Sequence, residues 1–192
     1  MKHIKLFESF KETNLNLDQV WYTGSGQERS SFTLDHLNKG NNNEHGPGIY
    51  LTNMLEDAKK YGKFIHVIKL NPTGEIIKRG EPVKKSDLSL VKNMIKKHVS
   101  DWEMEANNYH ENAARGLDEF VTIVSNSAED RIDFFEYVWA EFFMYEPKNF
   151  AVAMTASGID GIVLAGYNKM EGIAHVVAYN VDMLEIQEVI KL

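Results

Sequence analysis

The sequence predicts an α+β fold in a single domain. Short runs rich in β-branched and aromatic residues occupy both ends of the chain, which is typical of strands. Between them, over about residues 80–145, apolar side chains recur every three or four positions, which is typical of amphipathic helices. The length of 192 residues and the hydrophobic content of 43% suit one domain with a sizeable core. We therefore expect one domain over residues 1–192 with a helical insertion at about 80–145.

The expected elements can be placed in chain order. Strands are expected at 20–23, 49–51, 64–70, 75–78, 159–164, 173–179 and 184–190. Helices are expected at 53–62, 86–99, 118–124, 129–144 and 148–157. In the first of these helices, Asn53 is the expected N-cap, Glu56 stands at the capping-box spacing, and Gly62 ends the helix.

Composition excludes several classes of protein. The net charge is −7, whereas a binder of the DNA backbone needs a basic face. The chain has no cysteine, which excludes disulfides and thiolate metal sites, and its seven histidines form no zinc-binding motif, so no metal is expected. No apolar run approaches the ~18–20 residues of a membrane span, and the N-terminus is too charged for a signal peptide. We expect a soluble, cytoplasmic protein that does not bind membranes.

The stretch from Gly46 to Gly62 is the centre of the functional argument. Gly46 and Gly48 mark a loop, and residues 49–51 form a short buried strand that leads directly into a helix. Tyr50 therefore sits in mid-strand, beside a glycine-rich loop that lets another molecule approach the backbone. A tyrosine in this setting is either a core aromatic or a flat surface for a ligand, and the stretch alone leaves both open.

Four segments in this order resemble the ADP-ribosyltransferase superfamily, in particular its small prokaryotic and phage branch with a His-Tyr-Glu type of active site. They cover about residues 19–72 and 148–192 and leave the helical middle unmatched. The segments are Trp21–Ser25 (WYTGS), Gly46–Thr52 (GPGIYLT) with Asp57–Tyr61 (DAKKY), Gly158–Ile162 (GIDGI) and His175–Asn180 (HVVAYN). The layout is also similar to that of anti-CRISPR ADP-ribosyltransferases of phages.

The resemblance implies a split β-sandwich, in which two small sheets face each other across a cleft that binds NAD as co-substrate. Tyr50 would stack on the nicotinamide ring, and Tyr22 and Thr23 would hold the carboxamide and the ribose. The family pattern has a histidine or arginine where this chain has Tyr22, although a phenol can also donate a hydrogen bond. The full NAD-binding set expected here is Tyr22, Thr23, Gly24, Ser25, Gly48, Tyr50 and Tyr61. The Tyr61 ring is expected to pack in the core.

The third motif position, a glutamate in the family, falls on His175. Breaking the bond between nicotinamide and ribose develops positive charge on the sugar, which calls for a polarising group or a base. Glu171 and His175 lie four residues apart, so in an extended strand both would face the same side. Either one supplies this group, or Glu171 is an exposed charge and His175 a strand histidine. Asp57 is expected to be solvated or to face the helix dipole, and Asp160 is expected to be structural.

The function expected from these residues is mono-ADP-ribosyl transfer from NAD to a macromolecule, with release of nicotinamide. The acceptor would be a protein of the host of a bacteriophage, selected by the helical insertion in the host cytoplasm, and a nucleic-acid acceptor stays open. The catalytic set is Tyr22, Tyr50, Glu171 and His175. The alternative is a binding protein that keeps the transferase fold without catalysis, because the first and third motif residues are replaced.

Overall fold

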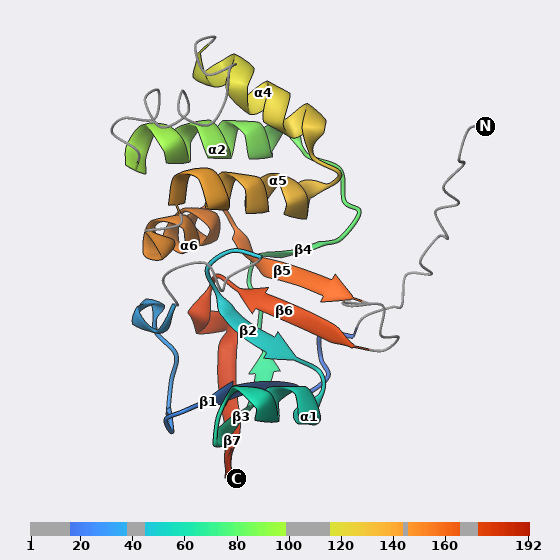
Figure 1. The fold of residues 1–192 in the computed structure, drawn as a ribbon, viewed down its shortest axis with the longest axis vertical. Coiled ribbons are helices and arrows are strands. Elements are labelled where there is room, and N and C mark those ends of the chain that lie inside the picture. The colour runs from blue at the N-terminus through green and yellow to red at the C-terminus, as the bar shows by residue number, and fades with distance from the viewer. Residues whose placement is uncertain (1–15, 38–44, 99–115, 144–145, 166–172) are drawn as a thin grey trace, which may run out of the picture.

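The computed structural model describes residues 16–37, 45–98, 116–143, 146–165 and 173–192. These residues form an α+β protein with a seven-stranded mixed sheet and a layer of helices (Figure 1). The strands are β1 (Trp21–Ser25), β2 (Ile49–Thr52), β3 (Phe64–Leu70), β4 (Glu75–Lys78), β5 (Ile159–Ala165), β6 (Ala174–Ala178) and β7 (Leu184–Lys191). All seven expected strands are thereby confirmed. Each run forms a strand because it supplies enough apolar and β-branched residues for a pleated, buried surface.

The strand order is β4-β5-β6-β2-β1-β3-β7. Only β4 and β5 run parallel, while the other neighbours are antiparallel. Strands that are distant in sequence therefore lie side by side, and the motif strands β1, β2 and β6 occupy the middle of the sheet.

The expectation of two separate facing sheets is wrong. β2 pairs with β6 over all four of its residues and β1 pairs with β3 over all five, but β1 and β2 share the single pair Tyr22↔Thr52. This pair joins a half made of β4, β5, β6 and β2 to a half made of β1, β3 and β7. The two groups of strands are therefore halves of one sheet with a weak seam.

The helical middle of the chain is confirmed in its described residues, while 99–115 and 144–145 lie outside them. Its described elements are α2 (Lys85–His98), α4 (Leu117–Ser127), α5 (Arg131–Val138) and the π-helical turn η4 (Trp139–Phe143), and α6 (Pro147–Ala156) follows them. Figure 1 shows these helices gathered at the end of the molecule where β4 and β5 lie. The short helix α1 (Leu55–Ala58) lies toward the opposite end, in contact with β1 and β2 (Figure 1). Short 3₁₀ turns complete the fold: η1 (Leu34–His36), η2 (Lys59–Tyr61) and η6 (Val181–Met183).

One hydrophobic core joins the helices to the sheet. Trp139, Phe143 and Tyr179 each make an edge-to-face contact with Phe150, at ring-centroid distances of 5.6–5.8 Å. All four rings are buried. Because such aromatic pairs add to the free energy gained by burial, this cluster holds α6 and η4 firmly against the end of β6.

A buried arginine ties α5 to β4 and α2. Arg131 is 1% exposed, and its guanidinium donates five hydrogen bonds of 2.8–3.0 Å to the carboxylates of Asp87, Glu75 and Glu81. The hydrogen bonds from Arg131 lower the pKa of Glu75 from 4.5 to about 2. A buried charge is tolerated only when it is paired in this way. The hydrophobic periodicity of the sequence did not reveal this network.

The start of α1 differs from the expectation. Asn53 is not its N-cap: Met54 holds that position, without a side-chain capping bond. The Asn53 carboxamide instead accepts a hydrogen bond from the Ala174 N–H at 2.9 Å, and the Asn53 N–H donates to the Ala174 carbonyl at 3.1 Å. Asn53 therefore continues the β2–β6 pairing by one residue, because the tertiary partner competes successfully with the local cap.

Within the described parts of the chain, every helix is too short or too polar to span a bilayer.

Candidate functional site

The first and third motif positions, Tyr22 and His175, form a row across the seam of the sheet with Thr52 between them. Tyr22 of β1 is paired with Thr52 of β2, and Thr52 is paired with His175 of β6. Paired residues point to the same face of a sheet, so the three side chains share one face. Adjacent strands lie about 4.8 Å apart, which places the Tyr22 and His175 backbones about 10 Å apart with Thr52 between them. The structure thus brings the first and third motif positions together.

Tyr50 belongs to the same face, because it lies two residues before Thr52 on β2. Its side chain is half-buried. The Tyr50 hydroxyl donates to the Gly46 carbonyl at 2.8 Å and accepts from the His45 N–H at 3.2 Å. The ring is therefore held by the loop that precedes its own strand, and it is not enclosed in the deep core.

The helix α1 and the turn η2 cover part of this face. Gly24, two residues after Tyr22, makes the close approach possible: a Cβ there would lie 2.1 Å from the Ala58 carbonyl oxygen and 3.0 Å from the Tyr61 Cβ. Gly62 is needed for a similar reason, since a Cβ would lie 2.2 Å from the Ser25 carbonyl oxygen. Gly62 does end the helical segment, as expected, but it does so beside the end of β1.

Asp57, on α1, faces His175. The Nε2 atom of His175 lies 3.0 Å from the Asp57 Oδ2, and the Lys60 ammonium lies 2.7 Å from the Asp57 Oδ1. Burial alone would raise the pKa of Asp57, but the hydrogen bonds from Lys60 and His175 outweigh it and lower that pKa below its usual value. Of the two alternatives for Asp57, a solvated side chain is wrong, because it is only 15% exposed, whereas its expected place in the first turn of the helix is found. Periodicity could not reveal a partner 118 residues away in sequence.

The seam opens beyond the pair Tyr22↔Thr52. Thr23, Gly24 and Ser25 pair with β3, and the facing residues Tyr50 and Leu51 pair with β6. In the described part of the chain, no register pair joins β1 to β2 at these positions. Figure 1 shows the two strands meeting at one end and separating toward the other. The edges of β1 and β2 therefore diverge between Gly24 and Tyr50.

Three other predicted binding residues, Thr23, Ser25 and Gly48, do not present a free side chain on the face that carries Tyr22 and His175. Thr23 lies on the opposite face, paired with His66, so only its backbone borders the seam. Ser25 is engaged in a turn, where its hydroxyl donates to the Gln27 carbonyl at 2.6 Å. At Gly48 a Cβ would lie 2.4 Å from the Val177 side chain, so this glycine packs against β6 of its own chain. These three positions contribute backbone and packing.

Tyr61 corrects a further expectation. Its side chain does not pack in the core, because the residue is 67% exposed, at the rim of α1 and η2 beside Gly24. Asp160 is structural, as expected. It is buried, accepts hydrogen bonds from the Thr73 and Gly74 N–H groups at 2.7 and 2.6 Å, and accepts one from the Asn180 amide at 2.8 Å. Glu171 lies outside the described residues.

The arrangement has definite chemical capacities. A carboxylate bound to one ring nitrogen of a histidine fixes the orientation and tautomer of the imidazole, which suits it to accept or hold a proton. The phenols of Tyr22 and Tyr50 offer polar groups and aromatic faces on the same side of the sheet. In the described residues, no group of three or more His, Cys, Asp or Glu side chains could hold a metal ion.

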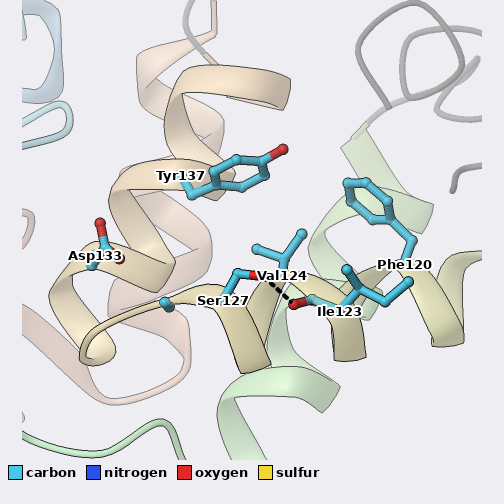
Figure 2. Close-up of a pocket in the computed structure, with 7 residues that line it drawn as sticks. Phe120, Ile123, Val124, Ser127, Asp133 and Tyr137 are labelled. Atoms are coloured by element: carbon cyan, nitrogen blue, oxygen red, sulfur yellow. Dashed lines mark hydrogen bonds between the residues drawn. The ribbon is translucent and has the colours of Figure 1, made fainter. Parts of the chain in front are cut away.

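Two cavities in the described part of the molecule lie away from the candidate site, one in the helical layer and one at the edge of the sheet. One of about 290 Å³ lies between α4 and α5 (Figure 2). It is lined by Phe120, Ile123, Val124, Ser127, Ala128, Asp133 and Tyr137. Another, of about 170 Å³, is lined by the residues just before β1 (Asp18, Gln19 and Val20) and by residues of β3 and β7. Neither includes a residue of the candidate site.

Fold and site thus define an α+β protein whose central strands carry a group of tyrosine, histidine and aspartate side chains beside the point where β1 and β2 diverge. Comparisons with protein-family models, with curated proteins and with solved structures gave no match.

Proposed function

We propose that this protein transfers ADP-ribose from NAD to a macromolecular acceptor, with the seam between β1 and β2 as its NAD site. The observation that carries the proposal is the grouping of Tyr22, Tyr50, Thr52 and the His175–Asp57 pair on one face, where the two strands diverge. The resemblance of the four sequence segments to ADP-ribosyltransferases supports the same assignment. Host proteins are the proposed acceptors if the chain is phage-encoded.

The reaction needs few groups. The bond between the nicotinamide nitrogen and the ribose breaks, nicotinamide leaves with the electron pair, and a nucleophile of the acceptor forms the new bond to the sugar carbon and loses its proton. Tyr50 provides the aromatic face for the nicotinamide. The edge of β1 at Thr23 and Gly24, which has no register pair with β2 among the described residues, faces the carboxamide. The imidazole of His175, oriented by Asp57, receives the proton or polarises the ribose hydroxyl. Glu171 is the alternative source of the polarising group.

Release of nicotinamide from NAD tests this proposal, measured with and without a bacterial lysate as the source of acceptor. Tyr50→Ala should lower kcat/KM on the order of 10²-fold, because the pyridinium loses its positioning surface. Asp57→Asn should lower it by about 10²-fold through the loss of the charged partner of His175. Asp118→Asn, an exposed aspartate on α4, is the matched control and should retain full turnover. Glu171→Gln and His175→Ala, assayed separately, identify the third catalytic group.

The proposal fails if the folded wild-type chain neither binds NAD nor releases nicotinamide, and if mass spectrometry finds no ADP-ribose adduct in the lysate. The replacement of the family's glutamate by His175 favours a second candidate, an NAD-binding protein without catalysis. That candidate predicts a measurable NAD affinity by calorimetry together with no nicotinamide release. Protease or nuclease digestion of labelled lysate distinguishes a protein acceptor from a nucleic acid.

A further inference from the structure

The loop before β2 connects the candidate site to the helical insertion. Tyr50 is anchored to this loop on one side, through the His45 N–H and the Gly46 carbonyl. The loop is also held by a residue of α5 and by the residue that follows β6. The Nδ1 atom of His45 lies 2.5 Å from the Glu136 Oε1, and the Tyr179 hydroxyl donates to the His45 carbonyl at 3.4 Å. One residue, His45, therefore contacts both Tyr50 and α5.

The His45–Glu136 pair is well protected from solvent. The side chains are 14% and 19% exposed, so water competes weakly for the bond. Arg79 places its Nη2 3.8 Å from the same carboxylate oxygen, which adds a positive charge on the other side of Glu136. A charge-assisted hydrogen bond in such a setting is among the stronger non-covalent links in a protein.

Glu136 is itself held in a fixed place. Its helix, α5, is capped by Asp130, whose carboxylate accepts from the Asp133 N–H at 2.9 Å and from the Gly80 N–H at 2.8 Å. The next residue, Arg131, binds three carboxylates from other elements, and Phe134 and Phe135 are buried in the core. The position of the Glu136 carboxylate is therefore set by the helical layer.

We infer that Glu136 is a positioning residue for the candidate site: through His45 it fixes the loop that holds the hydroxyl of Tyr50. This inference rests on the proposed function only where it concerns NAD binding. The link from Glu136 through His45 to the Tyr50 hydroxyl, called the clamp below, is a property of the fold. The helical insertion then has a second task besides acceptor selection. It keeps the aromatic surface of Tyr50 in place from a distance, without touching the bound dinucleotide.

Hydrogen–deuterium exchange of the full chain tests the clamp independently of activity. In Glu136→Ala, the amides of residues 45–52 should exchange on the order of tenfold faster than in the wild type, because the loop loses its anchor on α5. The amides of β3 should be unchanged. Glu129→Ala is the matched control, since Glu129 is an exposed acid just before α5. Exchange over residues 45–52 that is the same in the Glu136 and Glu129 variants would overturn the inference.

A second measurement separates positioning from general stability. Glu136→Gln keeps an acceptor for the imidazole, so it should restore most of the slow exchange that Glu136→Ala loses. The His45→Ala variant and the His45→Ala/Glu136→Ala double variant should exchange over residues 45–52 as fast as Glu136→Ala does. The effects of two substitutions in one interaction do not add. Fully additive effects, or no recovery in Glu136→Gln, would contradict the clamp.

Turnover provides the third readout. In Glu136→Ala, the KM for NAD should rise by about tenfold while kcat changes by less than about threefold, since the ring is misplaced before the bond breaks. If the wild type lacks turnover, the proposed function fails while the exchange experiment still decides the clamp. If turnover is present and the loop exchanges normally in the variant, the clamp fails and the proposed function stands.

Discussion

The Arg131 network and the His175–Asp57 pair differ in how many of their polar groups are bound within the protein and in how exposed they are. The Arg131 guanidinium has five N–H donors, and all five are bound to carboxylates at 2.8–3.0 Å. The His175 imidazole and the Asp57 carboxylate share one bond of 3.0 Å, and their side chains remain 18% and 15% exposed. The first group lies inside the helical end of the molecule, and the second lies on the sheet face beside the seam between β1 and β2.

The comparison indicates which of the two polar clusters is accessible to a ligand. A buried charge with every donor satisfied stabilises one arrangement of β4, α2 and α5, and no donor is left for a ligand. A partly exposed histidine whose ring is oriented by a carboxylate stays accessible to a ligand. The Arg131 network therefore stabilises the fold, whereas the His175–Asp57 pair is accessible enough for the role in the proposed transfer reaction. The following experiments test whether the two clusters differ in their effects on stability and on NAD binding.

The largest effect is expected from Arg131→Met. The substitution leaves three carboxylates together without their cation, which typically costs about 3–5 kcal/mol of the free energy of unfolding. Urea unfolding followed by circular dichroism measures this loss. Arg79→Met is the control: Arg79 is 46% exposed and should cost less than about 1 kcal/mol. Equal losses in the two variants would contradict the structural task of Arg131.

A smaller effect is expected at the seam, from Gly24→Ala. The added Cβ would lie 2.1 Å from the Ala58 carbonyl oxygen, so α1 must move away from β1. Overpacking of this kind costs about 1–3 kcal/mol, and the displaced Asp57 should weaken NAD binding. Gly26→Ala meets no atom within 4 Å and should change neither property. Thermal unfolding and calorimetric titration with NAD give both readouts, and identical behaviour of the two variants would count against close packing of α1.

Acid should weaken the Arg131 network through Glu75. The pKa of Glu75 in the folded protein is about 2, below its ordinary 4.5, so its ion pair contributes stability above pH 4.5 and loses it as the pH falls toward 2. Glu75 is partly exposed, so solvent screening limits the effect to a Tm shift on the order of 2–4 °C. The Tm gap between wild type and Glu75→Gln should be present at pH 6 and close at pH 2. A gap that stays constant with pH would refute this origin.

The smallest effect on stability is expected from Tyr61→Ala. Because the residue is 67% exposed, the free energy of unfolding should change by no more than about 0.5 kcal/mol. Tyr61 lies beside Gly24 at the rim of the candidate site, so the KM for NAD or for the acceptor should rise while stability is kept. A large loss of stability would show that Tyr61 packs more tightly in solution than its exposure indicates.

The secondary structure could be predicted well, for physical reasons that act locally. The run Phe64–Leu70 and the run Glu75–Lys78 form strands with the expected bounds. The helix expected at 86–99 is found at Lys85–His98, because an apolar stripe at helical spacing fixes the buried face. The α+β class followed from these elements together.

The site was predictable only in part. The motif positions Tyr22, Tyr50 and His175 do share one face, but this depends on a strand order that places β2 between β6 and β1. The partner of His175 was missed, since Asp57 looks like an ordinary helix acid in sequence. The cap expected at Asn53 was also wrong, because its amide binds a strand distant in the chain.

The described strands and helices could be predicted from local sequence, since hydrophobic period and turn residues act over a few neighbouring positions. Which charges meet depends on the folded chain: Arg131 lies against Glu75 and Asp87, His45 against Glu136, and His175 against Asp57. These partners are separated by 44 to 118 residues. An ion pair leaves no periodic trace in sequence, because its energy depends on distance and burial in the folded chain.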